Sequence, residues 1–179
     1  MQEERERGRI IGLRKRRLET AAWAATFIPL LAEARSELPE YADWGEPSRQ
    51  AYANWLNHPS RKVPQRRKGE WSSESVRRLF DIHIGLIDEA EQEFDIAIAV
   101  IRFKWKHADP DARTALGDEE FAVRQDRAQN INDAYRLSAD LRGRTYVDQK
   151  IPSRLQVVSS TRKKRSKANE PTEVQLSLF

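Results

Sequence analysis

Residues 72–107 read SSESVRRLFDIHIGLIDEAEQEFDIAIAVIRFKWKH, and this stretch decides the fold. One line of positions within it recurs at alternating intervals of four and three residues, which is the period of a helix packed along its length against partners. The line consists of Phe80, Ile84, Ile87, Glu91, Phe94, Ile98, Ile101 and Trp105. Ser72 or Ser73 is placed to cap the start of this helix. The pattern therefore predicts one long helix that ends near His107.

Two features of this helix make predictions about the core. Residues 96–101 are apolar on every side, which favours a helix buried all round, so we expect them at the centre of the core. Glu91 is the one charged residue on the line. A buried carboxylate needs a cationic partner, which Arg14, Arg17 or Arg124 could supply. The alternative is that the helix turns Glu91 to water.

The chain before this stretch also favours helices. Residues 1–38 have a helical apolar pattern, and Pro29 is expected to kink that helix or to start a second one. Residues 48–56 form a short segment of helical character with Pro47 just before it. No internal repeat is visible.

The chain after this stretch predicts two more helices. A short one is expected to start at Asp109 and to end near Gly117, and a last one to cover residues 118–142. The inner face of the last helix would consist of Phe121, Ala128, Ile131, Tyr135 and Leu141. The fold class is thus all-α, an irregular helical bundle over residues 1–146.

Composition and charge narrow the class of protein further. The chain has no cysteine, which excludes disulfides and thiolate metal sites and suits a reducing cytoplasm. No stretch approaches the roughly 18 apolar residues of a membrane span, so we expect neither export nor membrane insertion. The net charge is +4, and residues 150–179 contribute seven basic and two acidic residues to it. Residues 1–149 are therefore left with a net charge of -1.

Catalytic and metal-binding patterns are weak. Residues 81–95 contain six acidic residues and no lysine or arginine, and Asp88, Glu91 and Asp95 share a helical face that could hold a divalent cation for nuclease chemistry. A solvated face, or the partner of a basic helix, is the alternative. None of the three histidines has a metal-ligand spacing, and no nucleotide-binding or hydrolase motif is present. We therefore expect a protein that is not an enzyme and that binds no metal or cofactor.

The last five residues carry the most specific signal. They are Gln175, Leu176, Ser177, Leu178 and Phe179. This peptide resembles, at every defined position, the consensus by which bacterial polymerases, repair proteins and replication regulators bind the DNA sliding clamp. The resemblance implies that the glutamine amide bonds to clamp backbone, that the leucines and the phenylalanine fill an apolar pocket, and that the serine faces outward. The alternative is that the peptide folds back onto its own domain.

Basic residues are dense in two further segments. In the expected flexible linker, residues 147–173, they are Arg162, Lys163, Lys164, Arg165 and Lys167. A clamp encircles duplex DNA, so a linker tethered beside the docked peptide (residues 174–179) would be held near phosphates; a solubilising run is the alternative. In residues 61–68, expected to form a loop, they are Arg61, Lys62, Arg66, Arg67 and Lys68. Together with residues 14–17, we expect this loop to make any DNA contact of the body.

A second resemblance concerns the helical body. Trp55-Leu56, a proline- and arginine-rich gap, a long helix and the sequence PDARTALG at residues 110–117, followed by Phe121, Val123 and Arg127-Ala128, resemble phage antiterminator-like and sigma-region-four-like transcription regulators. The resemblance implies a helix-turn-helix whose second helix enters the major groove. Its base-reading residues would be Arg124, Gln125, Arg127 and Gln129. An ordinary packing helix is the alternative.

These patterns favour one function and leave a second open. The first is a non-enzymatic DNA-associated factor that docks on the sliding clamp and contacts double-stranded DNA, and its most specific form is a phage or mobile-element regulator of transcription, replication or antitermination. RNA polymerase or another replisome protein would then be a further partner. The second is a protein-only adaptor or inhibitor that occupies the clamp pocket and blocks host polymerases.

Overall fold

The structure is a computed structural model that describes residues 2–39, 45–61, 63 and 69–151. This part of the chain forms α-helices and no strand, which confirms the all-α fold class. The chain divides into two units, Met1–Gln149 and Lys150–Phe179, and only the first two residues of the second unit are described. None of the described helices is long and apolar enough to cross a membrane.

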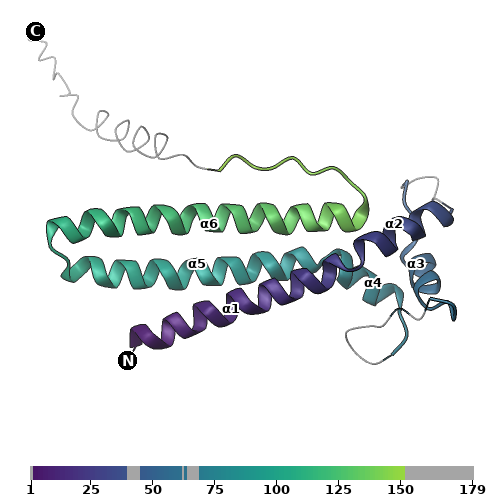
Figure 1. The fold of residues 1–179 in the computed structure, drawn as a ribbon, viewed down its shortest axis with the longest axis horizontal. Helices are drawn as coiled ribbons and strands as arrows, with labels where there is room; N and C mark the ends of the chain where they lie inside the picture. Colours follow the sequence, from purple (N-terminus) through teal and green to yellow (C-terminus); the bar gives the residue numbers. More distant parts are fainter. Residues whose placement is uncertain (1, 40–44, 62, 64–68, 152–179) are drawn as a thin grey trace, which may run out of the picture. The chain divides into compact units, whose positions relative to one another are not determined.

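Three long helices form what we call the helical arm. They are α1 (Gln2–Ala25), α5 (Ile82–His107) and α6 (Pro110–Arg142). Helix α5 packs against both of the others and runs antiparallel to each (Figure 1). Apolar residues on α1 and α5 fall at helical intervals, and burial of such faces stabilises helices of this length. The arm therefore has α5 at its centre.

Three short helices, α2 (Ile28–Glu37), α3 (Arg49–Leu56) and α4 (Ser73–Phe80), form the other end of the body. The helical pattern of residues 1–38 does break before Pro29, which lies in the first turn of α2. The Ser48 side chain caps α3, and Ser72 forms a capping box at the start of α4. The predictions of a restarted helix at the proline and of a short helix near residues 48–56 are thus confirmed.

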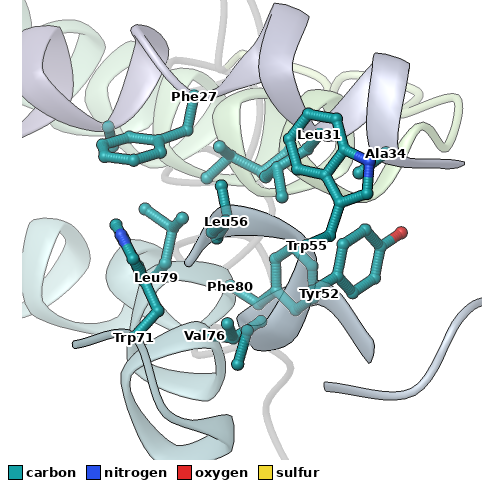
Figure 2. Close-up of a cluster of buried hydrophobic side chains, with 13 residues drawn as sticks. Phe27, Leu31, Ala34, Tyr52, Trp55, Leu56, Trp71, Val76, Leu79 and Phe80 are labelled. Carbon is teal, nitrogen blue, oxygen red and sulfur yellow. The ribbon is translucent and has the colours of Figure 1, made fainter. Parts of the chain in front are cut away.

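These short helices and the end of α6 enclose the main apolar cluster, the aromatic cluster (Figure 2). Phe27 makes edge-to-face contacts with Trp23 and Trp71, and Tyr52 makes one with Phe80. Its buried members are Ala24, Phe27, Leu31, Ala34, Tyr52, Ala53, Trp55, Leu56, Trp71, Val76, Leu79, Phe80 and Leu141. Burial of large aromatic and aliphatic side chains makes this end the principal core.

The prediction of one long helix over residues 72–107 was partly wrong. Ser72 is indeed the cap, but the helix breaks at Asp81, and α5 begins at Ile82. The buried residues of α5 are Leu86, Ala90, Glu93, Ile98 and Ile101. On the predicted line Ile84 is 55% exposed and Trp105 is 40% exposed. Because α5 lies between two partners, its buried surface is split over two faces and does not follow one line.

The prediction that residues 96–101 are buried all round, at the centre of the core, was also wrong. Ile98 and Ile101 are buried, but Ile96 and Val100 are only half-buried and Ala99 is exposed. The aromatic cluster contains none of these residues. Two neighbouring helices cover only part of the circumference of α5, so within the described part of the chain its third side has no cover.

Helix α6 is continuous from Pro110 to Arg142, so the expected turn near Gly117 was wrong. Asp109 caps its start, and Gly143 ends it with a left-handed backbone (φ 67°). A glycine inside a helix costs only about 1 kcal/mol, which tertiary packing of 33 residues offsets. The helix-turn-helix implied by the second resemblance therefore lacks its turn.

The predicted inner face of this last helix was right only in part. Leu141 is fully buried, but Tyr135 is 37% exposed, and the other three predicted positions are half-buried. The buried residues are Leu116, Asn132, Ala134, Ser138 and Leu141. Asn132 donates to the Gln149 carbonyl and accepts from the Gln149 amide and the Tyr146 hydroxyl. One buried amide thereby holds the segment after α6 against the helix.

Candidate nucleic-acid interface

Two residues of the basic band at residues 14–17, Arg14 and Arg17, bind a carboxylate within the fold. Arg17, only 8% exposed at its side chain, donates from its guanidinium to Glu93 at 2.7 Å. Arg14 donates to the other oxygen of the same carboxylate at 2.7 and 3.0 Å. Removing Arg17 to bind phosphate would leave a buried carboxylate short of charge. Burial therefore opposes a DNA contact by Arg17, whereas the side chains of Arg14, Lys15 and Arg16 are 53%, 74% and 66% exposed, and their contact with DNA stays a prediction.

Glu91 is paired, although with a different partner from those expected. Arg127 of α6 binds both of its carboxylate oxygens, at 2.5 and 2.6 Å. The same guanidinium lies 5.1 Å from the centre of the Phe94 ring. The buried carboxylate of α5 is instead Glu93, two residues along the helix. The expected buried acid paired by a neighbouring helix thus exists, but the residue was misidentified.

The acidic segment 81–95 is the partner of basic residues from three helices. Besides the two pairs above, Asp81 accepts from Arg77 at 3.2 Å and from Arg142 at 2.9 Å. Asp88 and Asp95 are exposed. Within the described ranges, no group of three or more histidine, aspartate or glutamate side chains is gathered as a metal ion would need. The acids of this segment mainly tie the helices together.

The base-reading residues implied by the second resemblance all lie on α6. They belong to one continuous helix, and not to a separate recognition helix that follows a turn. Arg124 is held by Glu120 of the preceding turn at 2.5 Å. Arg127 is bound to Glu91, and Gln125 and Gln129 are exposed. Since the two arginines already have carboxylate partners, base contacts would require breaking those pairs.

Arg61 begins the basic segment 61–68, and it is anchored. Its guanidinium stacks 3.9 Å from the centre of the Trp55 ring and donates to Glu37 at 2.6 Å. The Trp55 indole also donates to Glu37, at 2.8 Å. That hydrogen bond, with the Arg61 charge beside it, lowers the pKa of Glu37 below its ordinary value. Arg61 is therefore fixed beside the aromatic cluster.

The structure also gathers arginines that the sequence did not indicate. Arg49, Arg142 and Arg144 line one pocket of about 550 Å³, together with Ser48 and Glu46. Arg144 pairs with Glu46 at 2.5 Å, whereas Arg49, in the first turn of α3, is exposed. Residues 49 and 142–144 are remote in sequence, so no local run of charge could reveal this cluster.

Most of the other predicted interface residues lie outside the described residues. They are Lys62, Arg66, Arg67, Lys68, Arg162, Lys163, Lys164, Arg165 and Lys167. The clamp-type peptide, Gln175, Leu176, Ser177, Leu178 and Phe179, also lies outside them. Predictions about these positions therefore stay predictions.

Comparisons of the chain with protein-family models, curated protein sequences and solved structures found no match.

Proposed function

We propose that this protein is a non-enzymatic factor that docks on a bacterial DNA sliding clamp through residues 175–179 and holds its basic segments against the encircled DNA. The observation that carries the proposal is the sequence Gln-Leu-Ser-Leu-Phe, which satisfies every defined position of the clamp-binding consensus. The most specific form is a phage or mobile-element regulator of replication or transcription in the bacterial cytoplasm.

The residues of a short peptide contribute unequally to its binding free energy. Leu178 and Phe179 are the anchors, because apolar side chains in a preformed pocket contribute on the order of 2 kcal/mol or more each. Gln175 contributes roughly 1–3 kcal/mol through a buried hydrogen bond. Five residues suffice for such a contact, so the proposal requires nothing of the body's fold.

The DNA contact is inferred from the distribution of charge along the chain. Residues 150–179 have a net charge of +5, whereas residues 1–149 have -1. Tethering beside a docked peptide raises the local concentration of the linker's cations at DNA phosphates. On the body, the exposed Arg49 and Arg144, whose side chain is 60% exposed, are better placed for phosphate contact than Arg17, which is 8% exposed and bound to Glu93.

The clamp contact is tested by calorimetric titration of purified sliding clamp with the full chain, with a synthetic peptide of residues 170–179, and with a chain lacking Leu178 and Phe179. We expect the peptide to retain most of the affinity and the shortened chain to lose measurable binding. The matched control is Ser177→Ala, which should bind as the unmodified chain does. Undiminished binding by the shortened chain would place the contact elsewhere, and no binding by any form would refute the proposal.

A second function, a protein-only adaptor or inhibitor of the clamp pocket, is favoured by the body's net charge of -1 and by the internal pairing of its arginines. DNA binding separates the two functions. Anisotropy with duplex DNA should give a steep salt dependence under the first function, and substitution of the five basic residues 162–165 and 167 by glutamine should flatten it by roughly one slope unit per lost contact. Absence of salt-sensitive binding by the full chain would favour the inhibitor.

A further inference from the structure

The open side of α5 carries an apolar stripe that the fold leaves uncovered. Its positions are spaced four and three residues apart, and the three apolar ones, Ile96, Ala99 and Phe103, lie between the polar Gln92 and Lys106. Phe103 is 61% exposed and Ala99 is exposed. This is the interval of a helix that packs along its length against a partner. A partner on this side would also explain why residues 96–101 are apolar all round. Two sides of α5 contact α1 and α6, and the third side has no cover among the described residues.

The stripe lies at the floor of a groove between α1 and α5. Two adjoining hollows form this groove, and within the described residues only these two helices line them. The α1 wall contributes Glu3, Glu6, Arg9 and Arg16, and the α5 wall contributes Asp95, Arg102 and Lys106. From residue 2 to residue 16 of α1 the groove is about 20 Å long at the rise of an α-helix. It can therefore seat helices, not merely a loop.

The charges along the two walls alternate. At the end of the groove near the start of α1, that helix is acidic through Glu3 and Glu6, and α5 is basic through Arg102 and Lys106. Farther along, α1 is basic through Arg9 and Arg16, and α5 is acidic through Asp95.

Such a pattern is complementary to itself. When two copies face each other about a two-fold axis across the helices, the acidic part of α1 meets the basic part of α1 in the partner. When the axis runs along the helices, each part of α1 meets the oppositely charged part of the partner's α5. Opposite charges meet in both arrangements, which steers association and fixes register.

We propose that this groove is the interface of a homodimer, closed by the α1–α5 face of a second copy of this chain. Phe103 is the central anchor, because an exposed aromatic ring on an apolar floor gains most from burial. Some wall residues already have ion pairs: Glu6 with Arg9, Glu3 with Arg7 and Lys104, and Arg16 with Glu89. Pairs at the surface contribute little that a partner would have to outweigh. A face of this length predicts a weak, concentration-dependent dimer.

The test is sedimentation velocity on the full chain, from the low to the high micromolar range. We expect the weight-average mass to rise from the 20.8 kDa of one chain toward twice that value. Phe103→Glu should weaken the dimer at least tenfold. Ile11→Glu is the matched control, because Ile11 is 67% exposed on α1 but does not line the groove, and it should dimerise as the unmodified chain does.

A charge variant adds a second readout. Glu6→Arg should weaken the dimer in both two-fold arrangements, and more strongly at low than at high salt. A chain that stays monomeric at every concentration overturns the proposal and leaves the groove to another segment or another protein. Dimerisation that Phe103→Glu does not weaken overturns it as well, since the contact would then lie outside the groove. Neither result bears on clamp binding, which depends on residues 175–179.

Discussion

The aromatic cluster and the helical arm hold their helices together in different ways. All thirteen buried residues of the cluster are hydrophobic, and aromatic rings contact one another edge to face. The arm contains every buried polar or charged residue of the described chain: Arg17, Glu93, Asn132 and Ser138. One end of the body is therefore held chiefly by apolar burial, and the other by apolar burial together with specific polar pairs.

The two regions therefore contribute differently: the cluster stabilises the fold, and the polar pairs of the arm fix the register of its helices. Apolar burial is non-directional, so the cluster can stabilise the fold without fixing how far one helix slides along another. The Glu93 carboxylate, bound by Arg14 and Arg17, fixes α1 against α5 at one point, and Arg127 with Glu91 fixes α6 against α5 at another. Polar groups in a packed interface are known to specify register at some cost in stability.

The largest expected loss of stability comes from removing a buried polar pair of the helical arm. Glu93→Ala leaves Arg17, with a side chain only 8% exposed, without its carboxylate. A buried charge without a partner costs about 3–5 kcal/mol, and we expect the free energy of unfolding to fall by that amount in urea titration. A loss below about 1 kcal/mol would mean that water reaches Arg17 and that the pair is a surface pair.

The double variant Arg17→Met with Glu93→Leu is the matched control. It removes both charges and fills the space with apolar groups, so its stability should lie close to that of the unmodified chain or above it. We expect the single variant, and not the double variant, to unfold early. Equal losses in the two would show that packing volume, and not charge, is what Glu93 supplies.

The next prediction compares the loss of stability when an apolar side chain is truncated in each of the two regions. Leu56→Ala opens a cavity in the aromatic cluster, where Leu56 is fully buried, and should cost about 3–5 kcal/mol. Ile98→Ala, at a 6% exposed position of the arm, should cost less, about 2–3 kcal/mol, because the open side of α5 lets neighbours relax. Thermal unfolding followed by circular dichroism measures both. A larger loss at Ile98 would restore residues 96–101 as the centre of the core.

Secondary structure could be predicted from the sequence wherever local chemistry decides it. Pro29, Pro47, the Ser72 cap and the apolar periods are local signals, and helices do begin near these three residues. The break at Asp81 and the continuity through Gly117 depend on tertiary packing, which overrides weak propensities. The core was misplaced for the same reason: periodicity shows that a face is apolar, but not how many neighbours cover it.

The residues of the candidate interface also differ in whether the sequence alone could predict them. The need for a partner at an acidic residue of α5 follows from the cost of a buried charge, but whether Glu91 or Glu93 faces inward depends on the rotation of the helix. Arg49, Arg142 and Arg144 come together only through the fold. The clamp-type peptide is the opposite case, since its signal is entirely local and no element of the body bears on it.

The smallest effect concerns the polar edge of the aromatic cluster, where Glu37 accepts hydrogen bonds from Trp55 and Arg61. Its pKa is lowered from an ordinary value of 4.5, first by the Trp55 hydrogen bond and then by the Arg61 charge. A carboxyl group with a lowered pKa in the folded state stabilises the fold above its unfolded pKa, and this contribution disappears as the pH falls through the folded pKa. Glu37→Gln keeps the shape but not the charge, so the gap in urea midpoint between the unmodified chain and the variant should be largest at neutral pH and should close as the pH falls through the lowered pKa of Glu37. The Trp55 indole proton resonance, followed by nuclear magnetic resonance, should titrate over the same range and only in the unmodified chain. A gap that stays constant into the acid range would show that Glu37 acts through packing and hydrogen bonding alone, and that Arg61 is held beside Trp55 by the ring and not by the carboxylate.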